Sequence, residues 1–363
     1  MNVIRYTQSD YLDAISKLNR RAEASDAVQA VVAEVIREVR EHGDDGLIRL
    51  TQKFDGAALT TETLAVTAEE LSAAWSTVAA QTRPAMEGAV PLKEALEASH
   101  RNVYAFAMHS LRKNWSALNE QGAEVGEVFY PFERVGVYVP GGTAPLVSTA
   151  LMTVTLAAAA GVPEIVVCTP CGKDGQIQPA LLAALKLAGA TEVYRVGGAQ
   201  AIAAMAYGTQ TIRPVAKVFG PGNSYVVEAK RQTFGVVAVD LLPGPSEVMI
   251  LADKTGDAAC IAADILAQAE HGKDSQAGFV TDDAALLEAV LAEVQRQAET
   301  LSRQAMLRPV LEKGVFLILA SSLEEGAELV NQYAPEHLSL ITEREGEILP
   351  CIRTAGAIFL GNH

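Results

Sequence analysis

Two short segments in the last third of the chain carry polar side chains whose types and spacing could do chemistry. In the first, QYAPEHLSL (332–340), Glu336 and His337 come directly before a run that is typical of a β-strand. A carboxylate next to an imidazole can accept and hold a proton near neutral pH, so the pair is a candidate general base. Because adjacent residues of an extended chain point to opposite sides, we expect the two side chains to contact different groups. The alternative interpretation is a solvated loop end.

The second segment, ILAQAEHGKDSQAG (265–278), contains the end of a predicted helix whose apolar positions have the spacing of a buried face. That face continues onto Gln268 and His271, and we expect Gly272 to end the helix. An amide and an imidazole one turn apart could both reach one metal ion, and zinc accepts histidine readily but glutamine seldom. The alternative is a solvated helix end, where a histidine lies near the negative end of the dipole. Ligands of open α/β sheets usually lie at the amino ends of helices instead.

Four predicted strands run into glycine turns, in VYVPGGTAPLVSTA, RVGGAQAIAAMA, VFGPGNSYVVEAK and LPGPSEV. A tight turn before a helix presents free backbone N–H groups and the positive end of the helix dipole, which suits a pyrophosphate. The dinucleotide fingerprint is absent, because Tyr225 stands where GPGNSY (220–225) would need a third glycine. Both a nucleotide site and plain connections stay open for these turns.

The pattern of the elements predicts an α/β fold with mostly parallel sheets. Residues 1–110 have helical periodicity, whereas short β-branched runs alternate with Ala- and Leu-rich segments from residue 134 onward. Ten such runs are many for a single open sheet, so we expect two sheets, divided at the Pro/Gly-rich segment LLPGPSE (241–247). The runs are VGVYVP, EIVVCTP, EVYRVGG, AKVFGPG, VVAVDLL, VMILAD, GFVTD, GVFLILAS, HLSLIT and AIFLG.

The bulk composition is that of an ordinary globular protein, with 363 residues, 49% of them apolar and 20% charged. This length predicts two domains. The formal charge of −15 argues against nucleic acid and anionic membranes as partners. The amino terminus lacks the apolar stretch of a signal peptide, no run has the length of a membrane span, and the four cysteines form no disulfide framework. We therefore expect a cytoplasmic protein, in which the CTPC segment (168–171) holds two bystander thiols.

Taken in order along the chain, several segments resemble the histidinol dehydrogenase family: RVGVYVPGGTAPLVSTALM, VGGAQAIAAMAYGT, KVFGPGNSYVVEAKR, PGPSEV, AQAEHGKDSQ and YAPEHLSL. The amino-terminal GDDGLIRLTQKFDG is also similar to the family's, so the resemblance covers essentially the whole chain. It implies two successive NAD-dependent oxidations that convert L-histidinol into L-histidine through a bound aldehyde, with a zinc ion that holds the substrate.

The resemblance also implies a role for each matching side chain. It implies that NAD is bound by Tyr138, Gln200 and Asn223. It implies that the substrate contacts are Ser246, Gln268, His271 and His337, that the zinc ligands among them are Gln268 and His271, and that the acid/base pair is Glu336 and His337.

The domain arrangement and the assembly follow from the same resemblance. It implies two incomplete Rossmann-like domains, with an NAD-binding domain (138–245) inserted into one built from 1–137 and 246–363, and a homodimer. The family's chain continues past AGAIFLGN into a segment with a zinc-ligand Asp, a substrate-binding Glu and a His that reaches the partner subunit. We therefore expect an incomplete zinc site, a weakened dimer and impaired activity, since His363 does not replace those residues.

Two other functions stay open. A related NAD-dependent dehydrogenase of another polar alcohol would keep the glycine turns and the Glu336–His337 pair but would change the substrate contacts. A non-catalytic scaffold would keep the fold without turnover. A small-molecule substrate is expected in each catalytic case.

Overall fold

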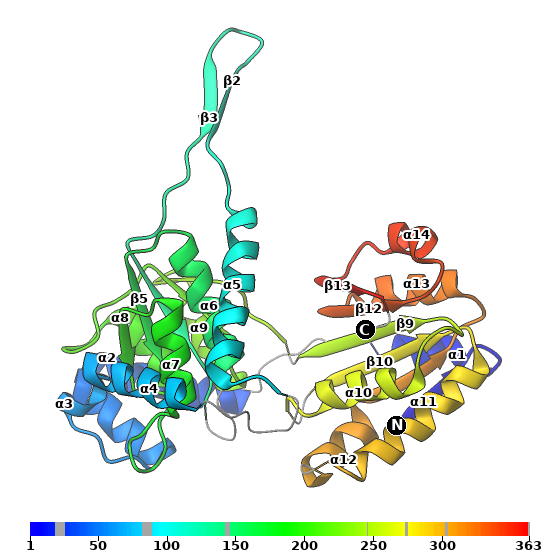
Figure 1. Ribbon diagram of the computed structural model, residues 1–363, viewed down its shortest axis with the longest axis horizontal. Helices are drawn as coiled ribbons and strands as arrows, with labels where there is room; N and C mark the ends of the chain where they lie inside the picture. The colour runs from blue at the N-terminus through cyan, green and yellow to red at the C-terminus, as the bar shows by residue number, and fades with distance from the viewer. Residues whose placement is uncertain are drawn as a thin grey trace. The chain divides into compact units, whose positions relative to one another are not determined.

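A computed structural model describes residues 1–18, 26–81, 89–141, 146–244, 246–272, 275–301 and 304–361. The chain forms two compact units (Figure 1). Unit 1 combines Met1–Glu23 with Pro243–His363, and unit 2 is Ala24–Leu242. A parallel sheet lies at the centre of each unit.

The sheet of unit 2 has the strand order β6-β5-β4-β7-β8. From β4 the chain first moves outward to β5 and β6, and it then returns to the other side of β4 for β7 and β8. This is a doubly wound order, and such sheets bind ligands at the carboxyl ends of the strands next to the reversal, here β4 and β7. The strands are β4 (Arg134–Tyr138), β5 (Glu164–Cys168), β6 (Glu192–Tyr194), β7 (Lys217–Phe219) and β8 (Ala238–Val239). The crossover helices are α6 (Val147–Ala159), α7 (Pro179–Ala188), α8 (Gly198–Tyr207) and α9 (Ser224–Thr233).

Helices cover both faces of this sheet. One face carries α2, α8 and α9, and the other carries α4, α5, α6 and α7. The helices that precede the sheet in the chain are α2 (Asp26–Phe54), α3 (Thr61–Leu64), α4 (Ala68–Ala80) and α5 (Leu92–Ser110). Within α2, Gly43 has a φ of 54°, a left-handed conformation that glycine adopts readily, and the helix is kinked there.

The helices after residue 24 lie in unit 2, whereas we expected all of 1–137 to join the carboxyl-terminal part of the chain. The apolar stripe of α2, which includes Val32 and Val39, is buried against α8 and α9. Likewise, α4 packs on α7. A helix must bury its apolar stripe against a neighbour, and these neighbours belong to the sheet of unit 2.

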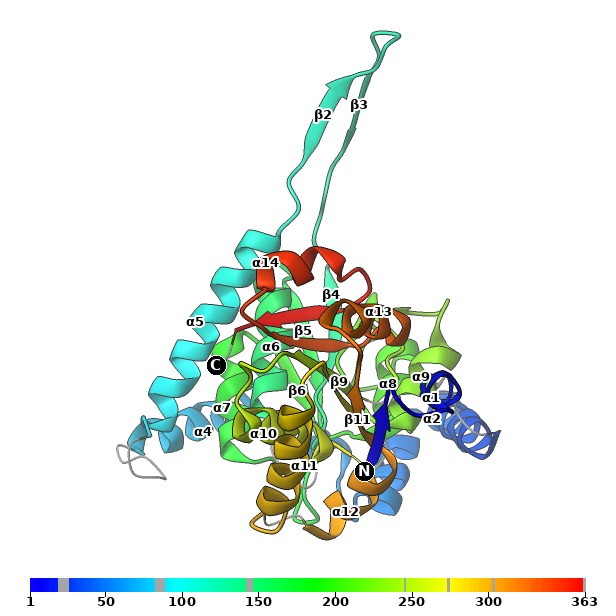
Figure 2. The ribbon, with the colours of Figure 1, turned by 90° about the vertical axis from the view of Figure 1, so that its right-hand side faces the viewer.

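Between α5 and β4 the chain forms an antiparallel hairpin that extends away from the rest of unit 2 (Figure 2). Its strands are β2 (Trp115–Leu118) and β3 (Glu124–Glu127), and every residue of both is exposed. The Trp115 indole N–H donates to Glu127 Oε2 across the ladder, at 2.8 Å. This hairpin was not predicted from the sequence, because neither strand has a buried face to produce an apolar alternation.

Unit 1 has the strand order β1-β11-β10-β9-β12-β13, with all pairs parallel. It repeats the doubly wound order, with the reversal between β9 and β12, and adds β1 at one edge. Helices α10 and α11 cover one face, and α1 and α13 cover the other. The strands are β1 (Asn2–Arg5), β9 (Glu247–Ala252), β10 (Gln276–Thr281), β11 (Val315–Leu319), β12 (His337–Ile341) and β13 (Ala357–Leu360). The helices are α1 (Tyr11–Ser16), α10 (Ala258–Ala269), α11 (Ala284–Ala298), α12 (Gln304–Lys313), α13 (Leu323–Tyr333), α14 (Glu345–Ile348) and the short η1 (Leu349–Cys351).

The α/β class with mostly parallel sheets and a helical amino-terminal region is therefore confirmed. Each predicted β-branched run contains a strand, and the runs divide between two sheets as expected. The prediction missed β1, which pairs with β11 at the edge of unit 1. Within the ranges that the structure describes, no helix combines the length and the apolarity needed to cross a membrane.

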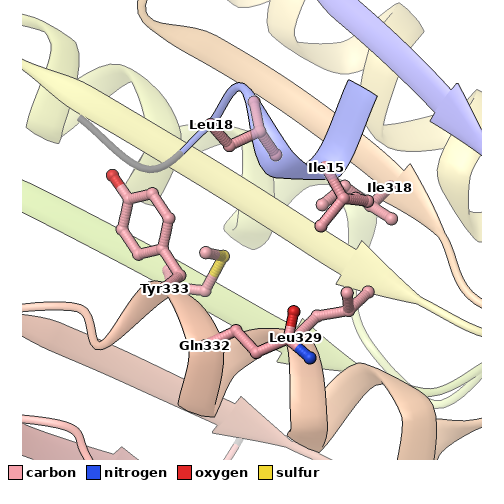
Figure 3. Close-up of a pocket in the computed structure, with 7 residues that line it drawn as sticks. Ile15, Leu18, Ile318, Leu329, Gln332 and Tyr333 are labelled. Atoms are coloured by element: carbon pink, nitrogen blue, oxygen red, sulfur yellow. The ribbon is translucent and has the colours of Figure 1, made fainter. Parts of the chain in front are cut away.

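A small apolar pocket lies between α1, α13 and the sheet of unit 1 (Figure 3). Its walls are mainly aliphatic, without the convergent polar groups that orient a ligand, so we assign it to core packing. Tyr333 stands at its edge, and its hydroxyl donates to Gln276 Oε1 at the start of β10, at 2.8 Å. The lining residues are Ile15, Leu18, Met249, Ile318, Leu329, Gln332 and Tyr333.

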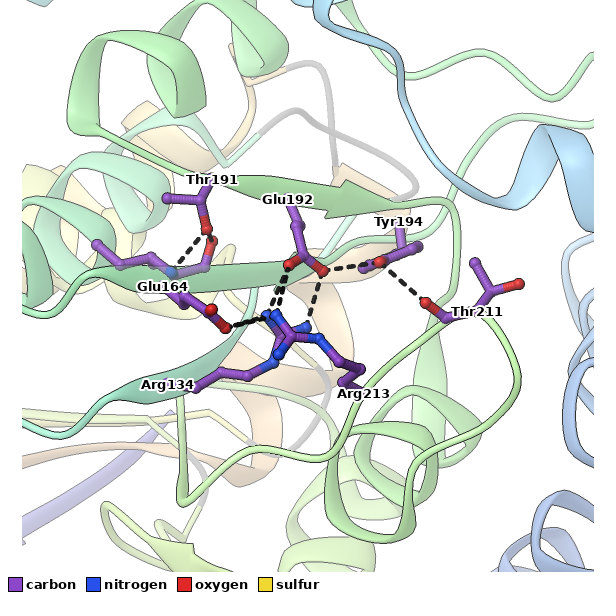
Figure 4. Close-up of polar contacts among 8 residues, drawn as sticks. Arg134, Glu164, Thr191, Glu192, Tyr194, Thr211 and Arg213 are labelled. Atoms are coloured by element: carbon purple, nitrogen blue, oxygen red, sulfur yellow. Dashed lines mark hydrogen bonds and ion pairs between the residues drawn. The ribbon is translucent and has the colours of Figure 1, made fainter.

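A charged network joins the amino ends of the strands in unit 2 (Figure 4). The buried guanidinium of Arg134 donates to Glu164 at 2.7 Å and to both oxygens of Glu192 at 2.6 and 2.8 Å. Glu192 also accepts from the Tyr194 hydroxyl at 2.7 Å. Because β4, β5 and β6 each supply one partner, the network links these three neighbouring strands of the sheet in unit 2.

We predict that this network weakens in acid. The Arg134 hydrogen bonds lower the pKa of Glu192, so its contribution to stability is present above the unfolded-state pKa of about 4.3 and is lost as the pH falls through the lower folded-state value. Glu192→Gln should therefore show a smaller fall in thermal midpoint between about pH 5 and pH 3 than the unmodified chain. Glu124→Gln, in the exposed hairpin, is the control. Parallel pH profiles for Glu192→Gln and the unmodified chain would contradict the prediction.

Candidate active site

Glu336 lies at the amino end of β12, where it meets the beginning of the neighbouring strand β9. Its Oε2 accepts a hydrogen bond from the Ser246 hydroxyl at 3.3 Å and another from the backbone N–H of Glu247 at 3.2 Å. The backbone approaches closely at this point, because a Cβ on Gly356 would lie 2.7 Å from the Glu336 carbonyl oxygen. Both hydrogen bonds of the Glu336 carboxylate are therefore made by Oε2, and neither involves Oε1.

His337 is oriented by the same residue of β9. Its Nδ1 lies 3.0 Å from the carbonyl oxygen of Glu247, and its ring stacks on Phe359 with centroids 6.1 Å apart. In the tautomer that donates from Nδ1 to this carbonyl, Nε2 keeps its lone pair and can accept a proton. The arrangement thus leaves one nitrogen of the ring available as a base.

The two side chains also approach each other, which corrects the expectation that they contact different groups. His337 Nδ1 lies 3.5 Å from Glu336 Oε2. The expectation assumed that both residues are in an extended strand, but β12 begins at His337 and Glu336 belongs to the preceding bend. The pair therefore shares the backbone of Glu247 and is close enough for charge coupling.

The carboxylate of Glu247 is a further acidic group near Glu336. Burial raises its pKa, and the nearby Glu336 carboxylate raises it further. Sequence reasoning assigned no role to Glu247, although it follows Ser246 directly in the PGPSEV segment.

Gln268 lies in the last turn of α10, and His271 follows the end of that helix. The helix ends at Ala269, so the expectation that it runs to Gly272 is wrong. His271 stays close to the helix end, because its backbone N–H donates to the Gln268 carbonyl at 3.2 Å. The His271 side chain is exposed, whereas Gln268 is buried and its Nε2 has no hydrogen-bond partner among the described residues.

These two side chains fit a metal ion as a partial set of ligands. Zinc accepts an imidazole nitrogen readily and an amide oxygen seldom, and no hydrogen bond at Nε2 fixes the orientation of the Gln268 amide among the described residues. Over the described ranges, no three His, Cys, Asp or Glu side chains come together in a way that could hold a metal. The zinc roles of Gln268 and His271 stay predictions.

The candidate residues of unit 1 all lie at one edge of its sheet. Ser246 precedes β9, Gln268 and His271 precede β10, and Glu336 and His337 open β12. In a parallel sheet the connecting helices end at the edge where the strands begin, so a helix carboxyl end belongs beside these residues. This explains why Gln268 and His271 lie at the end of a helix and not at its start.

In unit 2 the three predicted NAD contacts gather at the opposite kind of edge, the carboxyl ends of the strands. Tyr138 ends β4, and its buried hydroxyl accepts from the Gly198 N–H at 3.1 Å. Burial raises the pKa of Tyr138 to about 12, so its hydroxyl stays protonated. Gln200 is buried in the first turn of α8, and the Oδ1 of Asn223 caps α9 by accepting from the N–H groups of residues 225 and 226.

The turn after β7 passes directly over the end of β4. Gly220 has a φ of 110°, and a Cβ there would lie 2.1 Å from the Tyr138 carbonyl oxygen, so a side chain cannot be accommodated. Residues 142–145 of the first glycine turn lie outside the described residues, as does His363. A glycine turn of this kind brings backbone close to a ligand, and the residues present fit a dinucleotide at this edge.

A buried ion pair that sequence reasoning missed holds this turn. Lys230 Nζ donates to the Gly220 carbonyl at 2.5 Å and to Asp240 Oδ1 at 2.6 Å, and Asp240 Oδ2 accepts from the Gly220 N–H at 2.9 Å. The Lys230 side chain is only 1% exposed. A signal was present in the sequence, because Lys230 occupies the buried face that Val226 and Ala229 begin in α9.

The cysteines of the CTPC segment have the properties of unreactive thiols. Cys168 is fully buried, and burial raises its pKa to about 12. Burial also raises the pKa of Cys171. Because the thiolate is the reactive form, neither position favours nucleophilic chemistry.

We predict that Asp240→Ala destabilises the fold. It would leave the Lys230 ammonium buried without its carboxylate and the Gly220 N–H without an acceptor, which should lower the free energy of unfolding by about 3 kcal/mol. Urea denaturation measures this change. Asp174→Ala, at an exposed loop position after β5, is the matched control and should cost much less. Equal losses in the two variants would contradict the assignment.

Comparison with known proteins places these two groups of residues in context. The profile of the histidinol dehydrogenase family matches residues 18–363. A histidinol dehydrogenase of Rhizobium meliloti (strain 1021) is 44% identical over 351 residues, which cover 97% of this chain and 78% of the relative. That of Methanothermobacter thermautotrophicus (strain Delta H) is 42% identical over 360 residues, covering 99% of this chain and 82% of the relative.

A solved structure agrees with these relatives. The crystal structure of histidinol dehydrogenase from Elizabethkingia anophelis superposes with a TM-score of 0.90 at 35% sequence identity. The match covers 100% of this chain and 80% of the crystallised one.

Proposed function

Because the chain belongs to the histidinol dehydrogenase family of oxidoreductases, we propose that it oxidises L-histidinol to L-histidine in two NAD-dependent steps. The observation that supports this proposal most directly is the Glu336–His337 pair, which is held by the backbone of Glu247 with one ring nitrogen available as a base. An alcohol oxidation needs such a base, because a proton leaves the hydroxyl as hydride leaves the carbon.

The two steps place different demands on the residues of unit 1. In the first, the alcohol loses a hydride from carbon and a proton from oxygen, leaving an aldehyde. In the second, water adds to the aldehyde, and the resulting diol loses another hydride and proton to leave a carboxylic acid. Each step therefore releases one proton that a side chain must accept, in addition to the proton of the acid product.

We assign the proton transfers to His337 and Glu336. Nε2 of His337 accepts the hydroxyl proton in the first step, since Nδ1 is directed at the Glu247 carbonyl. Glu336, anchored through Oε2 by Ser246 and the Glu247 N–H, keeps Oε1 to receive a proton from the attacking water. Ser246 thereby positions the carboxylate and also lies where it can contact the substrate.

The remaining assignments concern binding. When bound, NAD would supply the hydride acceptor for each oxidation. The carboxyl edge of the sheet in unit 2 holds Tyr138, Gln200 and Asn223, together with the close-packed turn at Gly220. Their shared position supports a role in holding the dinucleotide. When bound, zinc would supply affinity for the nitrogen atoms of the substrate, through Gln268 and His271.

We predict that His337→Asn and Glu336→Gln each lower kcat for L-histidinol by at least about a hundredfold, because each removes one proton acceptor. NADH formation followed by absorbance measures the rate. His109→Asn, in the exposed last turn of α5, is the control and should keep the full rate. NAD affinity should be unchanged in all three variants. A His337→Asn enzyme with the unmodified rate would reject the assignment.

A separate prediction concerns zinc. His271→Ala and Gln268→Ala should each weaken zinc binding at least about tenfold, because each removes one of two ligands contributed by this part of the chain. Equilibrium dialysis with metal analysis measures the affinity without requiring turnover. His42→Ala, an exposed histidine of α2, should bind zinc like the unmodified chain. Unchanged affinity in both site variants would show that the ion, if bound, lies elsewhere.

A further inference from the structure

Asp55 is a partly buried carboxylate that the residues around it leave without a hydrogen bond. It follows the end of α2, and its Oδ2 is enclosed with no donor among the described residues. Burial raises its pKa, as expected for a carboxylate that loses hydration without gaining a partner. The enclosed Oδ2 therefore costs free energy, while the other oxygen, Oδ1, stays available to a hydrogen-bond donor from a ligand.

Three other enclosed acidic side chains in the described part of the chain are paired. Asp44 accepts from the Thr211 hydroxyl at 2.5 Å, Asp240 accepts from Lys230, and Asp253 accepts from the Thr342 hydroxyl at 2.5 Å. The fold thus regularly supplies donors to enclosed carboxylates. Asp55 departs from that pattern, which marks it as a group that the packing alone does not explain.

The position of Asp55 is at the carboxyl edge of the sheet in unit 2. A Cβ built on Gly197 would lie 3.3 Å from Asp55 Oδ2 and 2.7 Å from Pro170 Cβ, so the carboxylate lies against the turns that follow β5 and β6. Its negative charge also raises the pKa values of Tyr138 and Cys171. Asp55 is therefore beside the hydroxyl of Tyr138 and the start of α8, which carries Gln200.

The strand order identifies what a carboxylate would do here. In doubly wound dinucleotide-binding sheets, an acidic residue at the end of the second strand accepts hydrogen bonds from the adenosine ribose. The second strand of unit 2 is β5, and its end reads Cys168-Thr169-Pro170-Cys171, without an acid. Asp55, which comes from an earlier segment of the chain, lies beside Gly197, which Pro170 also adjoins, and brings a carboxylate to that region.

We propose that Asp55 accepts hydrogen bonds from the adenosine ribose hydroxyls of NAD and selects NAD over NADP. This inference rests on the proposed binding of NAD by unit 2. The oxygen of Asp55 that is not enclosed, Oδ1, can accept from the ribose hydroxyls, whereas the charge of the carboxylate repels the 2′-phosphate of NADP. No Arg or Lys side chain forms an ion pair with Asp55 in the described part of the chain, although the Lys173 side chain lies against the neighbouring Gly56.

The test is the affinity of Asp55→Asn for the two dinucleotides, measured by isothermal titration calorimetry on the whole chain without substrate. Asparagine keeps the size of the side chain and removes its charge. We expect NAD to bind about tenfold more weakly and NADP to bind no more weakly than before, so that the ratio of the two dissociation constants shifts at least tenfold toward NADP.

Matched variants separate this role from a structural one. Asp45→Asn removes the same charge at an exposed position of α2 and should leave both affinities unchanged. Asp55→Ser should give the same shift in preference as Asp55→Asn, and thermal midpoints establish that each variant is folded. Equal weakening of NAD and NADP, or an unchanged ratio in folded variants, would overturn the role of Asp55 alone. Failure of the unmodified chain to bind NAD would overturn the proposed function and this inference together.

Discussion

The candidate site of unit 1 depends on the backbone N–H and carbonyl groups of a single residue, Glu247. The N–H of Glu247 binds the Glu336 carboxylate, and the carbonyl of the same residue faces the imidazole of His337. Both contacts exist because β9 and β12 pair in parallel with His337 opposite Val248. A shift of this register by one residue would move the acid/base pair away from its anchors and turn the side chains of β12 to the other face. Sheet pairing, set by the buried strands, therefore determines the geometry of the chemistry at the sheet edge.

The two units share a strand order but use it differently. In unit 2 the predicted dinucleotide contacts lie at the carboxyl ends of the strands, where doubly wound sheets generally bind ligands. In unit 1 the candidate side chains lie at the amino ends, beside the end of α10. Backbone N–H groups at helix starts suit an anionic dinucleotide, whereas side-chain bases and metal ligands can be placed at either edge. Under the proposed function, this difference matches what each edge would bind.

Much of this fold could be predicted from local patterns, and the missed parts have a common physical cause. The buried parallel strands were predictable because both faces are apolar, as in β5 and β11. The hairpin β2–β3 has no buried face, and β1 is a short edge strand whose pairing with β11 spans most of the chain. The membership of α2 in unit 2 was also missed, because a helix stripe shows that a partner exists but not which one.

The site could also be predicted only in part: the residues of the motifs could be found from the sequence, and their supporting side chains could not. Motif resemblance selected Tyr138, Gln200 and Asn223, which the structure places at one sheet edge. The side chains that hold this edge were harder to find: Lys230 and Asp240 are ten residues apart in sequence, and Asp55 is distant from both. The period of α9 shows that Lys230 is buried, but it does not show that Asp240 is the partner of Lys230.

The hairpin between α5 and β4 has a consequence for how the protein fluctuates. Its backbone hydrogen bonds are exposed on both sides and its residues belong to none of the apolar clusters of unit 2. An isolated pair of strands is marginally stable in water. Amide hydrogens of β2 and β3 should therefore exchange with solvent through local opening, while those of β4, a few residues later in the chain, are protected by the whole sheet. Within one unit, neighbouring segments of β-structure thus differ widely in local stability.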